Sequence, residues 1–171
     1  MRMSIKLIMP CLLFWDSYKS SFNEMNHDGL VKGMDWDGES SPETYFKDAL
    51  DMKEGRNLGG LVRATNLWII HDGQYVGRMS IRHELNEWLR NYGGHIGYEI
   101  KTSARRKGFA TVALGLALKY CREEIGLKEL LLTCDDQNSA SYKTIERNMG
   151  QLIEKKNDQD GRLSRYYKII L

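Results

Sequence analysis

The sequence is poor in cysteine, in proline and in long apolar runs. It contains 3 cysteines and 2 prolines. An odd number of widely spaced cysteines does not form a disulfide framework, so we expect free thiols and a cytoplasmic location. No stretch approaches the roughly 18–20 consecutive apolar residues of a membrane-spanning helix. The apolar run near the N-terminus is interrupted by Pro10 and lacks the pattern of a signal peptide, so we expect no membrane partner.

The chain also lacks an excess of charge of one sign. Lys and Arg number 25 and Asp and Glu number 23, which gives a formal net charge of +2. This balance creates no strong field toward nucleic acid, which we therefore do not expect as a partner. A length of 171 residues with 42% hydrophobic residues suits one domain with a substantial core. We predict that residues 1–171 form a single domain.

Motifs for metals and for nucleotide hydrolysis are missing as well. His83-Glu84 begins like the zinc motif H-E-x-x-H, but no second histidine follows at the required spacing. The 4 histidines are scattered along the chain, and no ligand set assembles from them. The glycine-containing loop at Gly108 lacks the G-K-S/T of a phosphate-binding P-loop. We expect no metal ion.

The order of strands and helices predicts an α+β fold. Asp72-Gly73 between two apolar runs favours a tight hairpin. Apolar residues recur at helical spacing from Gly108 to Glu124, and residues 130–134 are typical of a strand buried on both faces. Further elements are expected as strands at 4–9, 95–100, 152–156 and 163–171, and as helices at 12–26, 41–53 and 138–147. Together they predict one mixed, mostly antiparallel sheet of about six to seven strands flanked by helices.

The segment from Gly97 to Ala110 carries the chemistry. It runs from a strand, through a basic loop, into the long helix. A helix N-terminus offers unpaired N–H groups and the positive end of the helix dipole. Gly108 and the small Ala110 let the backbone approach a bulky anion. Positive charge at the same place comes from Arg105, Arg106 and Lys107, so this segment predicts a pyrophosphate site.

Arg105-x-x-Gly108-x-Ala110 resembles the Q/R-x-x-G-x-G/A motif of the GNAT superfamily of N-acetyltransferases. The similarity extends to Asn138-x-x-Ser141 and to Gly150, while residues 82–98 resemble a bacterial branch of predicted acetyltransferases. The resemblance implies a GNAT-type fold with splayed central strands and acetyl-coenzyme A as co-substrate. It implies transfer of the acetyl group to a primary amine of a small molecule or peptide by direct attack.

The same resemblance implies roles for individual residues. The backbone of Tyr98 and Ile100 would hold the pantetheine arm of the coenzyme like an added strand. Asn138 would contact this arm from across the gap, and it is also expected to cap its helix. The pyrophosphate would lie on the loop residues Arg105, Arg106, Lys107, Gly108, Phe109 and Ala110.

The catalytic residues are less clearly marked. Ile145 occupies the position where many family members carry the tyrosine that protonates the leaving thiolate. Tyr142, one turn earlier, is one replacement; the alternative is a thiolate that leaves unaided. For the base, Glu84 and His95 are the main candidates, and a histidine near neutral pKa suits the task. Four side chains on or beside the central strands remain open for this role: His83, Glu84, His95 and Glu99.

Two other functions stay open. The chain could bind acyl-coenzyme A as a non-catalytic regulatory or sensor module, which the absent tyrosine favours. It could instead acetylate the N-termini of proteins. The C-terminal strands of this fold often pair between subunits, so the resemblance also implies a homodimer.

Overall fold

The computed structural model describes residues 4–26, 36–157 and 161–171. In these ranges seven strands form two antiparallel sheets, one of four strands in the order β1-β2-β3-β4 and one of three in the order β5-β7-β6. The strands are β1 (Ile5–Ile8), β2 (Ala64–His71), β3 (Gln74–Arg82), β4 (Ile96–Ile100), β5 (Glu129–Asp135), β6 (Gln151–Asn157) and β7 (Leu163–Ile170).

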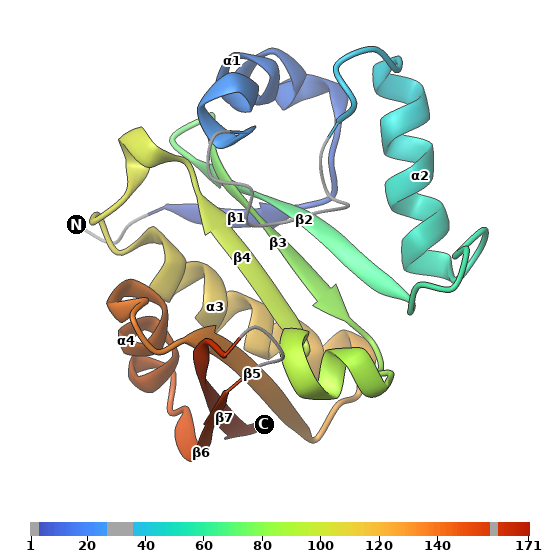
Figure 1. Cartoon of the computed structure of the whole chain (residues 1–171). Coiled ribbons are helices and arrows are strands. Elements are labelled where there is room, and N and C mark those ends of the chain that lie inside the picture. The colour runs from blue at the N-terminus through green and yellow to red at the C-terminus, as the bar shows by residue number, and fades with distance from the viewer. Residues whose placement is uncertain (1–3, 27–35, 158–160) are drawn as a thin grey trace.

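Helices flank both sheets, which confirms the predicted α+β class. The α-helices are α1 (Trp15–Asn26), α2 (Pro42–Glu54), α3 (Phe109–Tyr120) and α4 (Ser139–Arg147). Short turns of other helix types lie at η1 (Leu12–Phe14), η2 (Leu89–Gly93), η3 (Thr102–Ala104) and η4 (Cys121–Ile125). Figure 1 shows α1 and α2 above the four-stranded sheet. The three-stranded sheet and α4 lie below the four-stranded sheet in this view. Within the described ranges, none of the helices is long and apolar enough to cross a membrane.

The hairpin of β2 and β3 forms the centre of the larger sheet. Its turn residues Asp72 and Gly73 have φ values of 47° and 76°, as the Asp-Gly pattern predicts. Alternate side chains of β2 point to opposite faces of the sheet. Ile69 packs into the main core with residues of α3, whereas Trp68 packs into an aromatic cluster with Trp15 and Tyr18 of α1. The sheet is therefore buried on both faces.

Hydrogen bonds join the two sheets where the chain enters β4 beside β5. The amide of His95 donates to the Leu131 carbonyl at 2.7 Å, and the amide of Leu131 donates to Nδ1 of His95 at 2.9 Å. Gly94 has a φ of 62°, and a Cβ there would lie 2.6 Å from the Leu131 oxygen, so a side chain would prevent this approach. Beyond the junction β4 and β5 are edge strands of separate sheets. We predicted one sheet whose central strands splay apart. In the structure β4 and β5 separate so far that they belong to two sheets.

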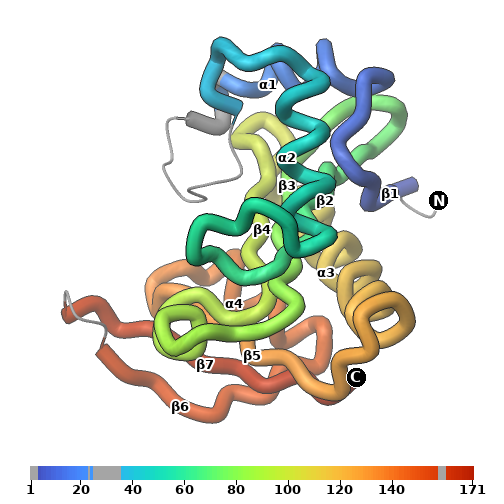
Figure 2. Tube along the Cα trace, turned by 90° about the vertical axis from the view of Figure 1, so that its right-hand side faces the viewer, coloured from blue at the N-terminus to red at the C-terminus, as the bar shows by residue number. Residues whose placement is uncertain are grey.

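Some elements differ in detail from the sequence-based expectation. The long helix after Gly108 is regular only to Tyr120 and continues as the π-helical turn η4. The segment between the strands expected at 152–156 and 163–171 lies partly outside the described residues, as does the segment after α1. Figure 2 shows α1 at one end of the molecule and the β6–β7 hairpin at the other, with β4 between them. β4 therefore lies where both halves can contribute to a site.

Candidate active site

Two cavities open beside β4. The first, which we name the motif cavity, has a volume of about 470 Å³ and lies between β4, the basic loop and α4. The second, the strand cavity, has a volume of about 710 Å³ and is walled by β2, β3, the segment around η2, β4 and the end of β5. Three residues line both cavities: Tyr98, Asn138 and Ser141. The two cavities therefore meet at these residues.

The basic loop presents backbone to the motif cavity. Gly108 is the N-cap of α3 with a φ of 80°, and no side chain caps the helix or places an acid in its first turn. Arg106 is also left-handed, with a φ of 62°. Left-handed residues in a short loop turn amide groups toward one side, an arrangement found in anion-binding concavities. The first turn of α3 is thus open to a negatively charged ligand.

Most of the predicted cofactor residues come together around this cavity. Its walls include Tyr98, Ile100, Arg105, Arg106, Gly108, Phe109, Ala110 and Asn138. Lys107 is exposed and is not part of the wall. Arg105 ties the loop to the strand, because its Nε donates to the carbonyl of Ile100 at 2.9 Å.

The hydrogen-bond register of β4 directs part of its backbone into the cavity. Arg82 N donates to His95 O at 2.8 Å and Lys101 N donates to Val76 O at 3.0 Å. In an antiparallel pair every second residue bonds to the partner strand, so residues 95, 97, 99 and 101 face β3. The backbone groups of Tyr98 and Ile100 face the other way, toward the gap. This is the edge that an added strand needs.

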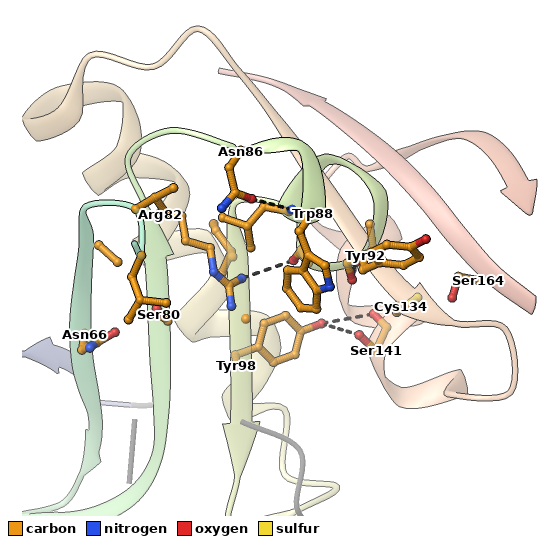
Figure 3. A pocket seen from close by; sticks show the side chains of 18 of the residues that line it. Asn66, Ser80, Arg82, Asn86, Trp88, Tyr92, Tyr98, Cys134, Ser141 and Ser164 are labelled. Atoms are coloured by element: carbon orange, nitrogen blue, oxygen red, sulfur yellow. Dashed lines mark hydrogen bonds between the residues drawn. The ribbon is translucent and has the colours of Figure 1, made fainter. Parts of the chain in front are cut away.

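Hydroxyl groups gather where the cavities meet. The Tyr98 hydroxyl lies 3.0 Å from Oγ of Ser141 and donates to its carbonyl at 3.3 Å (Figure 3). Burial raises the pKa of Tyr98 to about 12, so its hydroxyl keeps its proton near neutral pH. Oδ1 of Asn138 accepts from the Ser141 amide at 3.0 Å, which confirms the predicted helix cap.

The side chains predicted to act in catalysis lie away from this junction. Glu84 is exposed and lines neither cavity. His95 lines neither cavity, and its Nδ1 is engaged by the Leu131 amide. Burial is the main cause that lowers the pKa of His95. Tyr142 packs under Arg165, whose guanidinium carbon lies 3.8 Å from the ring centre.

The other open candidates are also engaged. Nε2 of His83 lies 2.8 Å from Oγ1 of Thr65. Glu99 forms a buried ion pair with Arg78 at 2.7 Å, on the face of the sheet opposite to Tyr98 and Ile100. Ile145 is fully buried beside Gly150, so the position of the usual tyrosine belongs to the core of this chain.

Sequence reasoning missed three side chains that line the cavities. Ser141 was recognised as part of a motif, but its hydroxyl was given no role. Tyr98 was expected to act through its backbone only. Arg82 stands at the end of β3 and carries no motif of its own. In the described part of the chain, no group of three or more His, Cys, Asp or Glu residues is placed to hold a metal ion.

Comparisons with known proteins identify the family and the fold of the chain. The family described as Acetyltransferase (GNAT) domain matches residues 23–149. No curated protein matches the sequence significantly. The fold is similar to the microcin C7 self-immunity acetyltransferase MccE, solved with acetyl-CoA and AMP, at 18% identity and a TM-score of 0.67, covering 98% of this chain and 92% of that chain.

Two further structures show the same fold. The acetyltransferase from Agrobacterium tumefaciens strain C58 has 19% identity and a TM-score of 0.64, covering 100% of this chain and 94% of that one. The Salmonella typhimurium enzyme that modifies the N-terminal serine of ribosomal protein L7/L12 has 17% identity and a TM-score of 0.65, covering 98% and 95%. Because the family match spans well over half of the sequence, the chain belongs to the GNAT acetyltransferases and is an acyltransferase.

Proposed function

We propose that the protein transfers the acetyl group of acetyl-CoA to a primary amine of a small molecule or peptide by direct attack. The observation that carries this proposal is the meeting of the two cavities at Tyr98, Asn138 and Ser141. A donor in the motif cavity and an acceptor in the strand cavity would reach each other only there. Direct attack needs such a meeting point, because it holds both reactants in one place.

The motif cavity fits the coenzyme in three respects. Its uncapped helix start and the cations Arg105 and Arg106 suit a pyrophosphate. The outward backbone edge at Tyr98 suits the amide groups of a pantetheine arm, and the Ile100 amide extends it, whereas the Ile100 carbonyl already accepts from Arg105. The amide group of Asn138 stands across the gap from that edge. We therefore assign pyrophosphate binding to the loop and pantetheine binding to β4 and Asn138.

The hydroxyl groups at the junction can supply a proton. When bound, acetyl-CoA supplies an activated thioester, and its sulfur needs a proton as it departs. Tyr98 stays protonated because of its raised pKa, and Ser141 lies within hydrogen-bond distance of it. We assign proton donation to this pair. Asp135 is the only carboxylate among the described residues on the strand-cavity wall, and we assign it as the acceptor of the ammonium proton.

The test is release of the coenzyme A thiol from acetyl-CoA in the presence of a panel of amines. The panel includes small primary amines and short peptides with free N-termini, since one structurally similar enzyme acts on a ribosomal protein N-terminus. We expect amine-dependent thiol release and an acetylated product that is 42 mass units heavier, about the mass of an added acetyl group less a proton. Acetyl-CoA binding without thiol release for any amine would contradict the proposal and favour the sensor module instead.

A further inference from the structure

Arg82 gives the strand cavity an unusual charge. Among the described residues on the wall, it is the only cation. It stands at the end of β3, and Figure 3 shows its guanidinium pointing from β3 toward Trp88 and Tyr98. A positive group at this place would repel an acceptor that carries only amines. An acceptor that also carries an anionic group would compensate for it.

The guanidinium is held in a fixed position. Its Nη1 donates to the carbonyls of Gly93 and Gly94 at 3.2 and 3.3 Å. Gly97 of β4 lies directly beside it, because a Cβ at this glycine would be 3.4 Å from both terminal nitrogens. The absence of a side chain at Gly97 makes room for the planar group against the strand. This arrangement holds the cation beside the strand that also carries Tyr98.

No carboxylate in the described ranges forms an ion pair with Arg82. Asp135 lies on the same wall but accepts from the Gln137 amide. Burial is the only cause that lowers the pKa of Arg82, and no neighbouring acid raises it. An arginine stays charged under all ordinary conditions. Most of this cation is buried, and the described residues give it no counter-ion, which is costly unless a ligand provides one.

The free edge of the guanidinium has the geometry of an oxyanion receptor. Both hydrogen bonds to the Gly93 and Gly94 carbonyls use Nη1, whereas Nε and Nη2 form the edge that can make two parallel bonds to one carboxylate or phosphate. Asn66 lines the same cavity and is 8% exposed, and its buried Oδ1 has no hydrogen-bond partner among the described residues. Both features are typical of a site that is completed by its ligand.

We propose that Arg82 binds an oxyanion of the acceptor, so that the acceptor is an amine that also carries a carboxylate or a phosphate group. This inference rests on the proposed function, because it places the reacting amine at the junction with Tyr98 and Ser141. The anionic group then lies against Arg82 on the same cavity wall. Amino acids, peptides with a nearby acidic group and phosphorylated amines fit this description, whereas polyamines do not.

Matched amines test the proposal. Glycine, β-alanine and γ-aminobutyrate are each compared with their carboxamides, phosphoethanolamine with ethanolamine, and spermidine serves as the polyamine. Thiol release is measured at saturating acetyl-CoA. For the best-fitting chain length we expect kcat/KM to be at least about tenfold higher for the anionic member, mainly through KM. Comparing the carboxylate pairs with the phosphoethanolamine pair shows which oxyanion is preferred.

Variants assign the preference to the residue. In Arg82→Gln we expect the ratio of anionic to neutral amine to fall to about one, and in Arg82→Lys to an intermediate value because lysine cannot make the paired bonds. Arg90→Gln is the matched control, since Arg90 is exposed on η2 and lines neither cavity. A wild-type enzyme without preference would overturn the proposal. So would a preference that survives in a folded Arg82→Gln protein, which would leave Arg82 only the role of holding the η2 turn.

A binding experiment separates this inference from the proposed function. The same amine pairs are titrated calorimetrically into protein saturated with coenzyme A. Tighter binding of the anionic member that is lost in Arg82→Gln would support the Arg82 site even if no thiol were ever released. Equal binding of both members would overturn it. Absence of thiol release for every amine, by contrast, would contradict only the transferase proposal.

Discussion

The two cavities beside β4 differ in the parts of the chain that line them. The motif cavity is walled by β4, the loop that ends at Gly108, the first turn of α3 and one side of α4, and the start of α3 has no side-chain cap. The strand cavity is walled by side chains that come from β2, β3, the η2 segment, β4 and β5. The motif cavity therefore depends more on chain conformation, and the strand cavity depends more on residue identity.

This difference matches the two kinds of ligand that we assign to the cavities. A coenzyme has a constant structure, and backbone groups can recognise it whatever the neighbouring side chains are. An acceptor differs from enzyme to enzyme, and an exposed side chain such as Trp88 can change without disturbing the fold. A change in backbone conformation should therefore remove coenzyme binding, whereas side-chain changes at the junction should alter turnover.

The largest effect is expected from Gly108→Trp. The φ of 80° at Gly108 strains any other residue, and an indole there would occupy the space where the loop meets the cavity. We expect the Kd for acetyl-CoA, measured by calorimetric titration, to rise at least about 100-fold, equivalent to about 2.7 kcal/mol. Such a loss would show that this stretch of backbone binds the coenzyme.

Gly126→Trp is the matched control for this substitution. Gly126 follows the other end of the same helical segment with a φ of 79°, and a side chain there would meet open space. It imposes a similar backbone strain far from the cavity. Acetyl-CoA affinity should stay close to that of the wild type. An equal loss of affinity in both variants would mean that strain in the helix, and not the loop, is responsible.

The next effect is expected at the junction. Tyr98→Phe and Ser141→Ala each remove one hydroxyl of the proposed donor pair. We expect kcat to fall about 10- to 100-fold in each variant, with acetyl-CoA affinity changed less than about threefold. The double variant should lose little more than either single one, because the two hydroxyls act as one unit. Steady-state kinetics and titration measure the two quantities separately.

Tyr142→Phe tests the rival donor in the same assay. Its ring lies under Arg165, away from both cavities, so we expect kcat to remain near the wild-type value. A fall in this variant alone would restore Tyr142 as the acid. Unchanged kcat in all three variants would support a thiolate that leaves unaided. In the wild type, kcat should not decline between pH 7 and 10 through ionisation of Tyr98, because its pKa is about 12.

The contrast between the cavities also explains which features could be predicted from the sequence. The motif cavity is formed mainly by one continuous stretch, residues 98–111, so its residue types and spacing were visible in the chain. Arg82, Tyr98 and Ser141 converge only after β3, β4 and α4 are placed together. His95 was taken for a base because of its chemistry, while its bond to Leu131 depends on the approach of β5. Ionisable residues alone could not indicate which of them face a cavity.

A smaller effect is expected from the two roles of Asn138. Asn138→Ala removes the helix cap and should lower the free energy of unfolding by about 1 kcal/mol. Asn138→Asp keeps a capping oxygen and should retain most of that stability. Both variants lose the side-chain amide donor of a residue that lines the motif cavity, so we expect the Kd for acetyl-CoA to rise about tenfold in each. Wild-type affinity in the Asp variant would show that Asn138 is only a cap.

The smallest effect concerns the junction of the two sheets, on which both cavities depend. Nδ1 of His95 must be unprotonated to accept from the Leu131 amide, and burial lowers the pKa of His95 below its usual range. A group whose pKa is lower in the folded state stabilises the fold above its unfolded pKa, and this contribution is lost as the pH falls through the folded value. Denaturant unfolding should therefore show a loss of stability in acid.

His95→Ala should remove this dependence and cost about 1 kcal/mol near neutral pH, because the Leu131 amide loses its partner. His71→Ala is the control, since His71 lies at the end of β2 beside the hairpin turn and far along the strand from the junction. Its acid profile should resemble that of the wild type. If the stability of His95→Ala still fell in acid as much as that of the wild type, protonation of another group would be responsible. The arrangement of β4 and β5 would then not depend on the bond between His95 and Leu131.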